Sequence, residues 1–135
     1  MRDDELLMKF EDRSLPIGCF HHEEHVRIAF LYLKQYPVLE VLGRFPTALR
    51  SYASAHGKDG LYHETISWTY IFIIRERMSA TSRAATWEEF KEQNADLFCK
   101  PAKLLEKYYK AETLASPIAR TEFIMPDKAV PRGAD

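Results

Sequence analysis

The sequence predicts an all-α fold, a single-domain helical bundle of three long helices followed by shorter C-terminal helices. Apolar residues recur at spacings of three and four along most of the chain, which is the helical period. One run, residues 68–74, has the aromatic and β-branched content of a strand, but no neighbouring segment is available to pair with it. The 135 residues, 46% hydrophobic and 29% charged, match a globular domain with one core.

The first elements are delimited by a breaker and a proline. A short amphipathic helix is expected over residues 3–12, and it ends before the Leu-Pro-Ile-Gly breaker at 15–18. The first long helix is expected over residues 20–36, because Pro37 cannot continue its hydrogen-bond ladder. Residues 1–18 are therefore expected to form an N-terminal arm with a short helix, ahead of the bundle.

The second long helix is expected to begin at Pro37. It carries an apolar stripe with alternating spacings of four and three that ends at His56. Gly43 and Pro46 interrupt this pattern, so a kink or a break is expected there. Gly57 follows the last residue, in the position where glycine commonly ends a helix.

The remaining helices follow from apolar period and capping signals. The third long helix is expected over residues 62–78. Thr86 and Glu89 form a capping box that starts a short helix, and a further helix follows Pro101. One or two last helical turns are expected within residues 112–120.

Domain limits, charge and composition restrict the classes of partner. The bundle domain is expected to span residues 19–125, and residues 126–135, which lack an apolar period, to form a flexible tail. A net charge of −1 provides no basic field for phosphates, so nucleic acid is not an expected partner. The sequence shows neither a bilayer-spanning apolar run nor a targeting segment, and its two cysteines match no CxxC pattern. We therefore expect a cytoplasmic protein with no membrane partner.

Three histidines lie within five residues at the start of the first long helix. Residues three or four apart share one side of a helix, so His21 with His25, and His22 with His25, form two pairs of neighbouring imidazoles. Two imidazoles from one helical turn are a common way to supply two ligands to Zn, Fe, Cu or Ni. A metal is then held if other elements bring further donors.

Helix topology indicates which other donors share this end of the bundle. Helices joined by short connections lie antiparallel, so the start of the first helix meets the end of the second and the start of the third. His56 ends the second helix, and Tyr62, His63 and Glu64 open the third. All five histidines are therefore expected at one end, with His25 close to His63.

Several named motifs are absent from the sequence. The spacing His22-Glu23-Glu24-His25 is one residue short of the zincin motif HExxH, and no GxGxxG, Walker A or GxSxG pattern occurs.

Each histidine also has a structural interpretation. A histidine near a helix start can cap the helix, remain solvated, or form a hydrogen bond with a neighbour within the core.

The pattern FHHxxHVR at residues 20–27, YHETIxW at 62–68 and WEEF at 87–90 resembles a family of small bacterial all-helical proteins with no assigned function. The resemblance covers about residues 19–127. It implies a bacterial origin and that the histidine-rich segments belong together, and it supplies no activity.

Two classes of function are consistent with these patterns. The first is a metal-dependent hydrolase or oxygenase acting on a small molecule, with Glu64 as ligand or general base and Tyr62 beside it. Its divalent metal, which the sequence does not identify, would be held by His21, His22, His25 and His63. The alternative is a non-catalytic helical module, with structural histidines, that binds a partner or forms a homodimer. A metal-free acid/base enzyme using His63 and Glu64 is a third hypothesis.

Overall fold

A computed structural model describes residues 1–81, 85–99 and 101–128 of the chain. Every regular element in these ranges is a helix or a short 3-10 turn, which confirms the all-α prediction. In chain order the elements are α1 (Asp3–Glu11), η1 (Ile17–Cys19), α2 (His22–Gln35), α3 (Val38–Ala55), η2 (Asp59–Leu61), α4 (Glu64–Ala80), α5 (Trp87–Gln93), α6 (Asp96–Cys99), α7 (Pro101–Glu106), α8 (Ala111–Leu114) and α9 (Pro117–Thr121).

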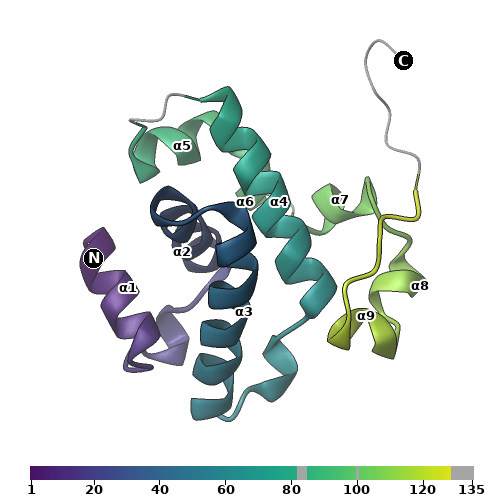
Figure 1. The fold of residues 1–135 in the computed structure, drawn as a ribbon, viewed down its shortest axis with the longest axis horizontal. Coiled ribbons are helices and arrows are strands. Elements are labelled where there is room, and N and C mark those ends of the chain that lie inside the picture. Colours follow the sequence, from purple (N-terminus) through teal and green to yellow (C-terminus); the bar gives the residue numbers. More distant parts are fainter. Residues whose placement is uncertain (82–84, 100, 129–135) are drawn as a thin grey trace.

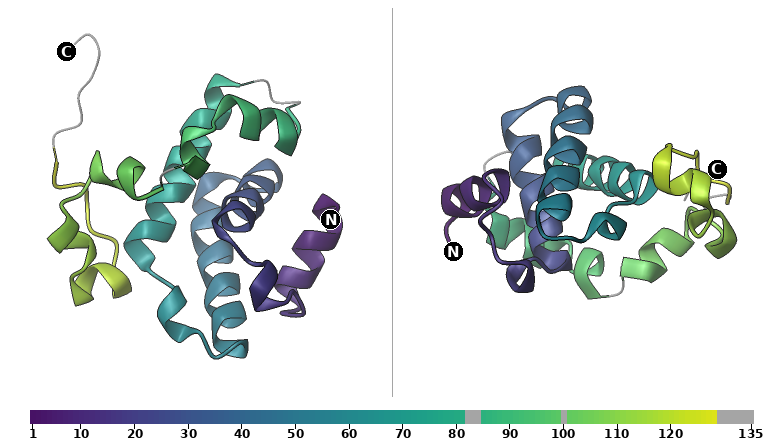
Figure 2. Two further views of the ribbon diagram at one scale, coloured as in Figure 1. Left: turned by 180° about the vertical axis from the view of Figure 1, so that it is seen from behind. Right: turned by 90° about the horizontal axis from the view of Figure 1, so that it is seen from below.

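The three longest helices, α2, α3 and α4, each contact the other two (Figure 1). The first helix, α1, packs on α2 and α3 at one flank, and α9 packs on α4 at the opposite flank, as the turned views of Figure 2 also show. The core between them is rich in aromatic rings, and Phe10, Phe45 and Tyr52 are fully buried there.

Helix α3 continues through its internal proline as one helix. Pro46 has no N–H, so the carbonyl of Leu42 loses its usual helical donor. Of the two predicted outcomes, a kink or a break, the break is wrong, because α3 continues from Val38 to Ala55 and buries both Phe45 and Pro46. Packing of this apolar face offsets the single missing hydrogen bond.

The end of α3 is defined by its glycine. Gly57 adopts a left-handed conformation with φ of 67°, which a residue without Cβ tolerates at no steric cost. The N–H of Lys58 donates to the carbonyl of Ala53 at 2.8 Å, and that of Gly57 to Ser54 at 3.0 Å. This pair of bonds is the Schellman motif, and the predicted helix end is confirmed.

The C-terminal helices agree with some of the predicted signals. Thr86 and Glu89 form the expected capping box, with the Thr86 N–H donating to Glu89 Oε1 at 3.0 Å. The one or two helical turns expected within residues 112–120 are the short helices α8 and α9, and Ser116 caps the second. Asp127 accepts from the Lys110 N–H at 2.9 Å, so the start of the predicted tail is hydrogen-bonded to the domain. Residues 129–135 lie outside the described residues.

Candidate functional site

His63 uses both ring nitrogens to hold the start of α4. Its Nδ1 accepts from the Ile66 N–H at 3.2 Å, so His63 is the N-cap of the helix. Its Nε2 donates to the carbonyl of Leu114, 2.8 Å away on α8. The ring is buried, and the two bonds define one neutral tautomer with hydrogen on Nε2. No lone pair remains for a metal unless the N-cap bond breaks.

His21 and His22 open α2 and have different partners. The carboxylate of Glu24 accepts from both Nδ1 and the backbone N–H of His21, at 2.9 and 2.8 Å, and the His21 side chain is 73% exposed. The Nε2 of His22 donates to the carbonyl of Leu97 at 2.8 Å, which ties α2 to α6. Each histidine therefore has a hydrogen-bond role in the fold.

His25 lies among aromatic rings. Its ring stacks on Phe45 with centroids 5.4 Å apart, and the Phe20 and Tyr70 rings lie at 6.1 and 6.2 Å. Its Nε2 is shielded from solvent and makes no hydrogen bond with the described residues. Burial, with a smaller effect of the nearby His22, lowers the pKa of His25 to about 4. His25 is thus neutral at physiological pH.

The structure brings three of the predicted histidines together and leaves the fourth apart. His21, His22 and His25 line one cavity of about 170 Å³ under Leu49 and Leu61. The ring of His25 contacts Tyr70, about two helical turns beyond His63 along α4, and His63 bonds to α8 instead. The expected pairing of His25 with His63 is therefore not made.

Side chains of the types that ligate metals are spread along the part of the chain that the structure describes. In residues 1–81, 85–99 and 101–128, no group of three or more His, Cys, Asp or Glu side chains is positioned to hold an ion. The fifth histidine, His56, donates from Nε2 to the carbonyl of Arg13 at 3.1 Å. This bond connects the end of α3 to the loop after α1. His56 does not line the cavity of His25 and does not take part in the hydrogen bonds of His63.

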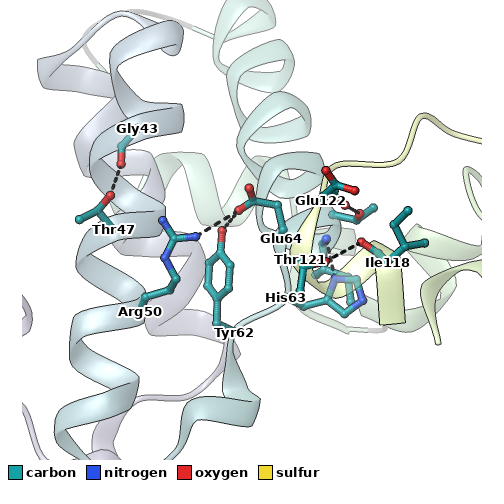
Figure 3. Close-up of polar contacts among 11 residues, drawn as sticks. Gly43, Thr47, Arg50, Tyr62, His63, Glu64, Ile118, Thr121 and Glu122 are labelled. Carbon is teal, nitrogen blue, oxygen red and sulfur yellow. Dashed lines mark hydrogen bonds and ion pairs between the residues drawn. The ribbon is translucent and has the colours of Figure 1, made fainter. Parts of the chain in front are cut away.

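The two remaining predicted site residues, Tyr62 and Glu64, do interact. The Tyr62 hydroxyl donates to Glu64 Oε1, and Arg50 Nη1 lies 3.7 Å from the same oxygen. Figure 3 shows the Tyr62 and Arg50 side chains converging on the Glu64 carboxylate, with the His63 ring pointing away from them. His63 and Glu64, which were predicted to act together, therefore point to opposite sides of the segment that enters α4 (Figure 3).

Burial and hydrogen bonding determine the protonation of the Tyr62 hydroxyl. Burial and the bond to Glu64 raise the pKa of the Tyr62 hydroxyl well above its ordinary value. Tyr62 is therefore a hydrogen-bond donor and not a base at neutral pH. The Arg50 guanidinium lies 4.9 Å from the Tyr62 ring centroid, so the ring also contacts a cation.

Two arginines of this region were missed by the sequence analysis. Arg50 and Arg120 line a cavity of about 380 Å³ together with Tyr62, between α3 and α9. One signal was present in the sequence: Ala53 and Ser54, three and four residues after Arg50, leave room on the same helical face. Arg120 reaches the carbonyls of Gly60 and Tyr62 from a segment far away in the chain, so its position has no local signal.

No family model, curated protein or solved structure matches the chain. The resemblance to a bacterial helical family therefore stays a prediction. Within the ranges that the structure describes, none of the helices combines the length and the apolar content needed to cross a bilayer.

Proposed function

We propose that the protein is a non-catalytic helical binding module in which the histidines stabilise the fold. One observation carries the proposal: both nitrogens of His63, which was the key donor from a second helix, are engaged by backbone groups. Without His63, the three histidines of α2 come from a single helical turn, and a stable metal centre needs donors that other elements contribute.

Three histidines make the same kind of long-range bond, which supports a structural role. His22, His56 and His63 each donate from Nε2 to a backbone carbonyl, at Leu97, Arg13 and Leu114 respectively. These bonds join residues 75, 43 and 51 positions apart in the chain. A buried carbonyl that loses its donor destabilises a fold by about 1–3 kcal/mol, so the partly buried bonds of His22 and His63 help to hold distant segments together. The bond of His56 is exposed to solvent and contributes less.

Metal uptake distinguishes this proposal from the enzyme hypothesis. The chain, purified without a histidine tag, is incubated with Zn, Fe, Cu or Ni, and the bound metal is measured after removal of the excess. We expect less than about a tenth of an equivalent of each metal. About one equivalent, lost in both His22→Ala and His25→Ala while the far-ultraviolet spectrum is unchanged, would contradict the proposal.

A metal-binding role, and with it a hydrolase or oxygenase, is the second candidate because of the cavity shared by His21, His22 and His25. Metal-ligating histidines usually donate their other ring N–H to a carbonyl, and His22 donates in this way to Leu97. The nitrogen atoms that could coordinate a metal are then Nδ1 of His22 and Nε2 of His25, which has no hydrogen-bond partner among the described residues. Their ring centroids lie 6.3 Å apart, so binding one ion would require side-chain rotation.

We propose that the partner of the module is a small-molecule ligand and that the protein is cytoplasmic. Nucleic acid and membrane are not among the proposed partners. Self-association into a homodimer stays a prediction, and light scattering coupled to gel filtration measures it directly: a mass of about 31 kDa, twice that of the chain, indicates the dimer.

A further inference from the structure

A cavity of about 380 Å³ lies between α3, the segment that leads into α4, and α9. Arg50 and Ser54 line it from α3, Asp59 and Tyr62 from the connecting segment, and Arg120 from α9. Small-molecule sites have volumes of about 300 to 1,000 Å³, so this cavity has room for a ligand of modest size. Its lining residues differ from those of the smaller histidine cavity.

Arg50 carries a positive charge that the protein satisfies only in part. Its Nη1 lies 3.7 Å from Glu64 Oε1, beyond ordinary hydrogen-bond distance, and its side chain is 53% exposed. The guanidinium covers the Tyr62 ring, and Figure 3 shows it reaching from α3 toward the start of α4. None of its guanidinium N–H groups donates to a described residue, so the donors are available to a ligand.

Arg120 supplies a second cation whose position is fixed. Its Nη2 donates to the carbonyls of Gly60 and Tyr62, the latter at 3.1 Å. These bonds hold the guanidinium against the segment that enters α4. The N–H groups on Nε and Nη1 make no hydrogen bond with the part of the chain that the structure describes. Two guanidinium groups therefore border one cavity with unused donors.

We propose that this cavity binds a small organic carboxylate. The parallel N–H groups of a guanidinium match the two oxygens of a carboxylate, and Tyr62 and Ala53 line the same cavity beside the rest of the ligand. Asp59 also lines the cavity, and Glu64 lies beside Arg50, so a monoanion meets less repulsion than a phosphate dianion. The inference rests on the proposed function, since it names the ligand class of the binding module.

Fluorine NMR on the full chain tests the ligand class. Para-fluorobenzoate and the aliphatic trifluorobutyrate are titrated, with their primary amides as neutral ligands of matched shape. We expect at least one carboxylate to bind with a Kd below about 10 mM and at least about tenfold more tightly than its amide. Equal binding of acid and amide, no binding of either acid, or tighter binding of inorganic phosphate would each overturn the inference.

Two arginine variants locate the binding. Arg44 is a matched control, because it is 54% exposed, pairs with Glu40 and lies 4.4 Å from the Tyr36 ring centroid, but lines a different surface. Arg50→Gln should weaken carboxylate binding about tenfold and Arg44→Gln less than about twofold. Equal effects would overturn the assignment. If Arg50→Gln fails to fold, Arg50→Lys retains the charge without the fork and should still weaken binding.

The two proposals fail in different ways. Absence of carboxylate binding, together with negligible metal uptake, removes this inference and leaves the structural role of the histidines in place. Metal uptake of about one equivalent, lost in the His22 and His25 variants, removes the non-catalytic proposal. The arginine variants do not alter the histidine donors, so the two readouts remain independent.

Discussion

The His25 ring lies parallel to the ring of Phe45, with centroids 5.4 Å apart and 23° between the planes. No described residue accepts or donates at its Nε2, which solvent does not reach. An imidazolium at this place would lose its hydration without gaining a carboxylate, so the charged form is disfavoured. The pKa of about 4 follows mainly from this burial.

Stability should therefore fall as the pH is lowered from about 6.5 to about 4. The folded-state pKa of His25 is below its value of 6.5 in the unfolded chain, so the unfolded state binds the proton first. The expected contribution is a loss of about 3 kcal/mol in the free energy of unfolding, complete below pH 4. Urea unfolding across this pH range measures it. His25→Phe should remove this part of the pH dependence, whereas His21→Gln, at an exposed position, should retain it.

His63 variants separate its two hydrogen bonds. His63→Ala removes the N-cap and leaves the Leu114 carbonyl without its donor, so the expected loss is about 2–4 kcal/mol. His63→Asn keeps a good N-cap residue but is too short to reach Leu114, and about half of this loss is expected. Chemical denaturation measures both. A loss below about 1 kcal/mol in the alanine variant would contradict the structural role.

Glu64→Gln tests the coupling within the Tyr62 cluster. The negative charge of Glu64 contributes to the raised pKa of the Tyr62 hydroxyl, so the neutral amide should lower that pKa toward the ordinary tyrosine value. Burial still acts on the hydroxyl, and the return should be partial. Ultraviolet titration of tyrosinate, with Tyr62→Phe to identify the signal, measures the change. An unchanged Tyr62 pKa would show that the Glu64 contact is not formed.

Tyr52→Phe tests the attachment of the N-terminal arm. The Tyr52 ring is fully buried, and its hydroxyl donates to the carbonyl of Leu15 at 2.9 Å. The phenylalanine variant keeps the ring and leaves a buried carbonyl without a donor, so a loss of about 1–3 kcal/mol is expected. Thermal and urea unfolding measure it, and an effect below about 0.5 kcal/mol would mean that water replaces the hydroxyl.

Local signals predicted the helices well because their causes lie within a few residues. Pro37 ends α2, Gly57 ends α3, and the Thr86 capping box starts α5. Of the kink or break expected at Pro46, the break was wrong, because burial of the surrounding apolar face outweighs one missing hydrogen bond. The four-residue α6 and the bounds of α8 and α9 had no strong apolar period to reveal them.

The candidate site was harder to predict because topology indicates at which end of the bundle a residue lies, but not the direction in which its side chain points. Antiparallel packing predicts that the starts of α2 and α4 share one end, which is why His25 and His63 were expected to lie together. An N-cap residue lies outside the helical stripe, however, and His63 turns toward Leu114 on a segment whose position the sequence did not predict. The contact of Arg50 with Glu64 likewise depends on how two helices are rotated about their axes.

The most direct test of the structural role of the histidines is nitrogen-15 NMR of the imidazole rings during a zinc titration. We predict that His63 keeps hydrogen on Nε2 and an unprotonated Nδ1, and that its ring signals do not move at about one equivalent of zinc. A stoichiometric shift of His63 Nδ1, together with the signals of His22 and His25, would place all three on one metal and rule out the structural role of His63.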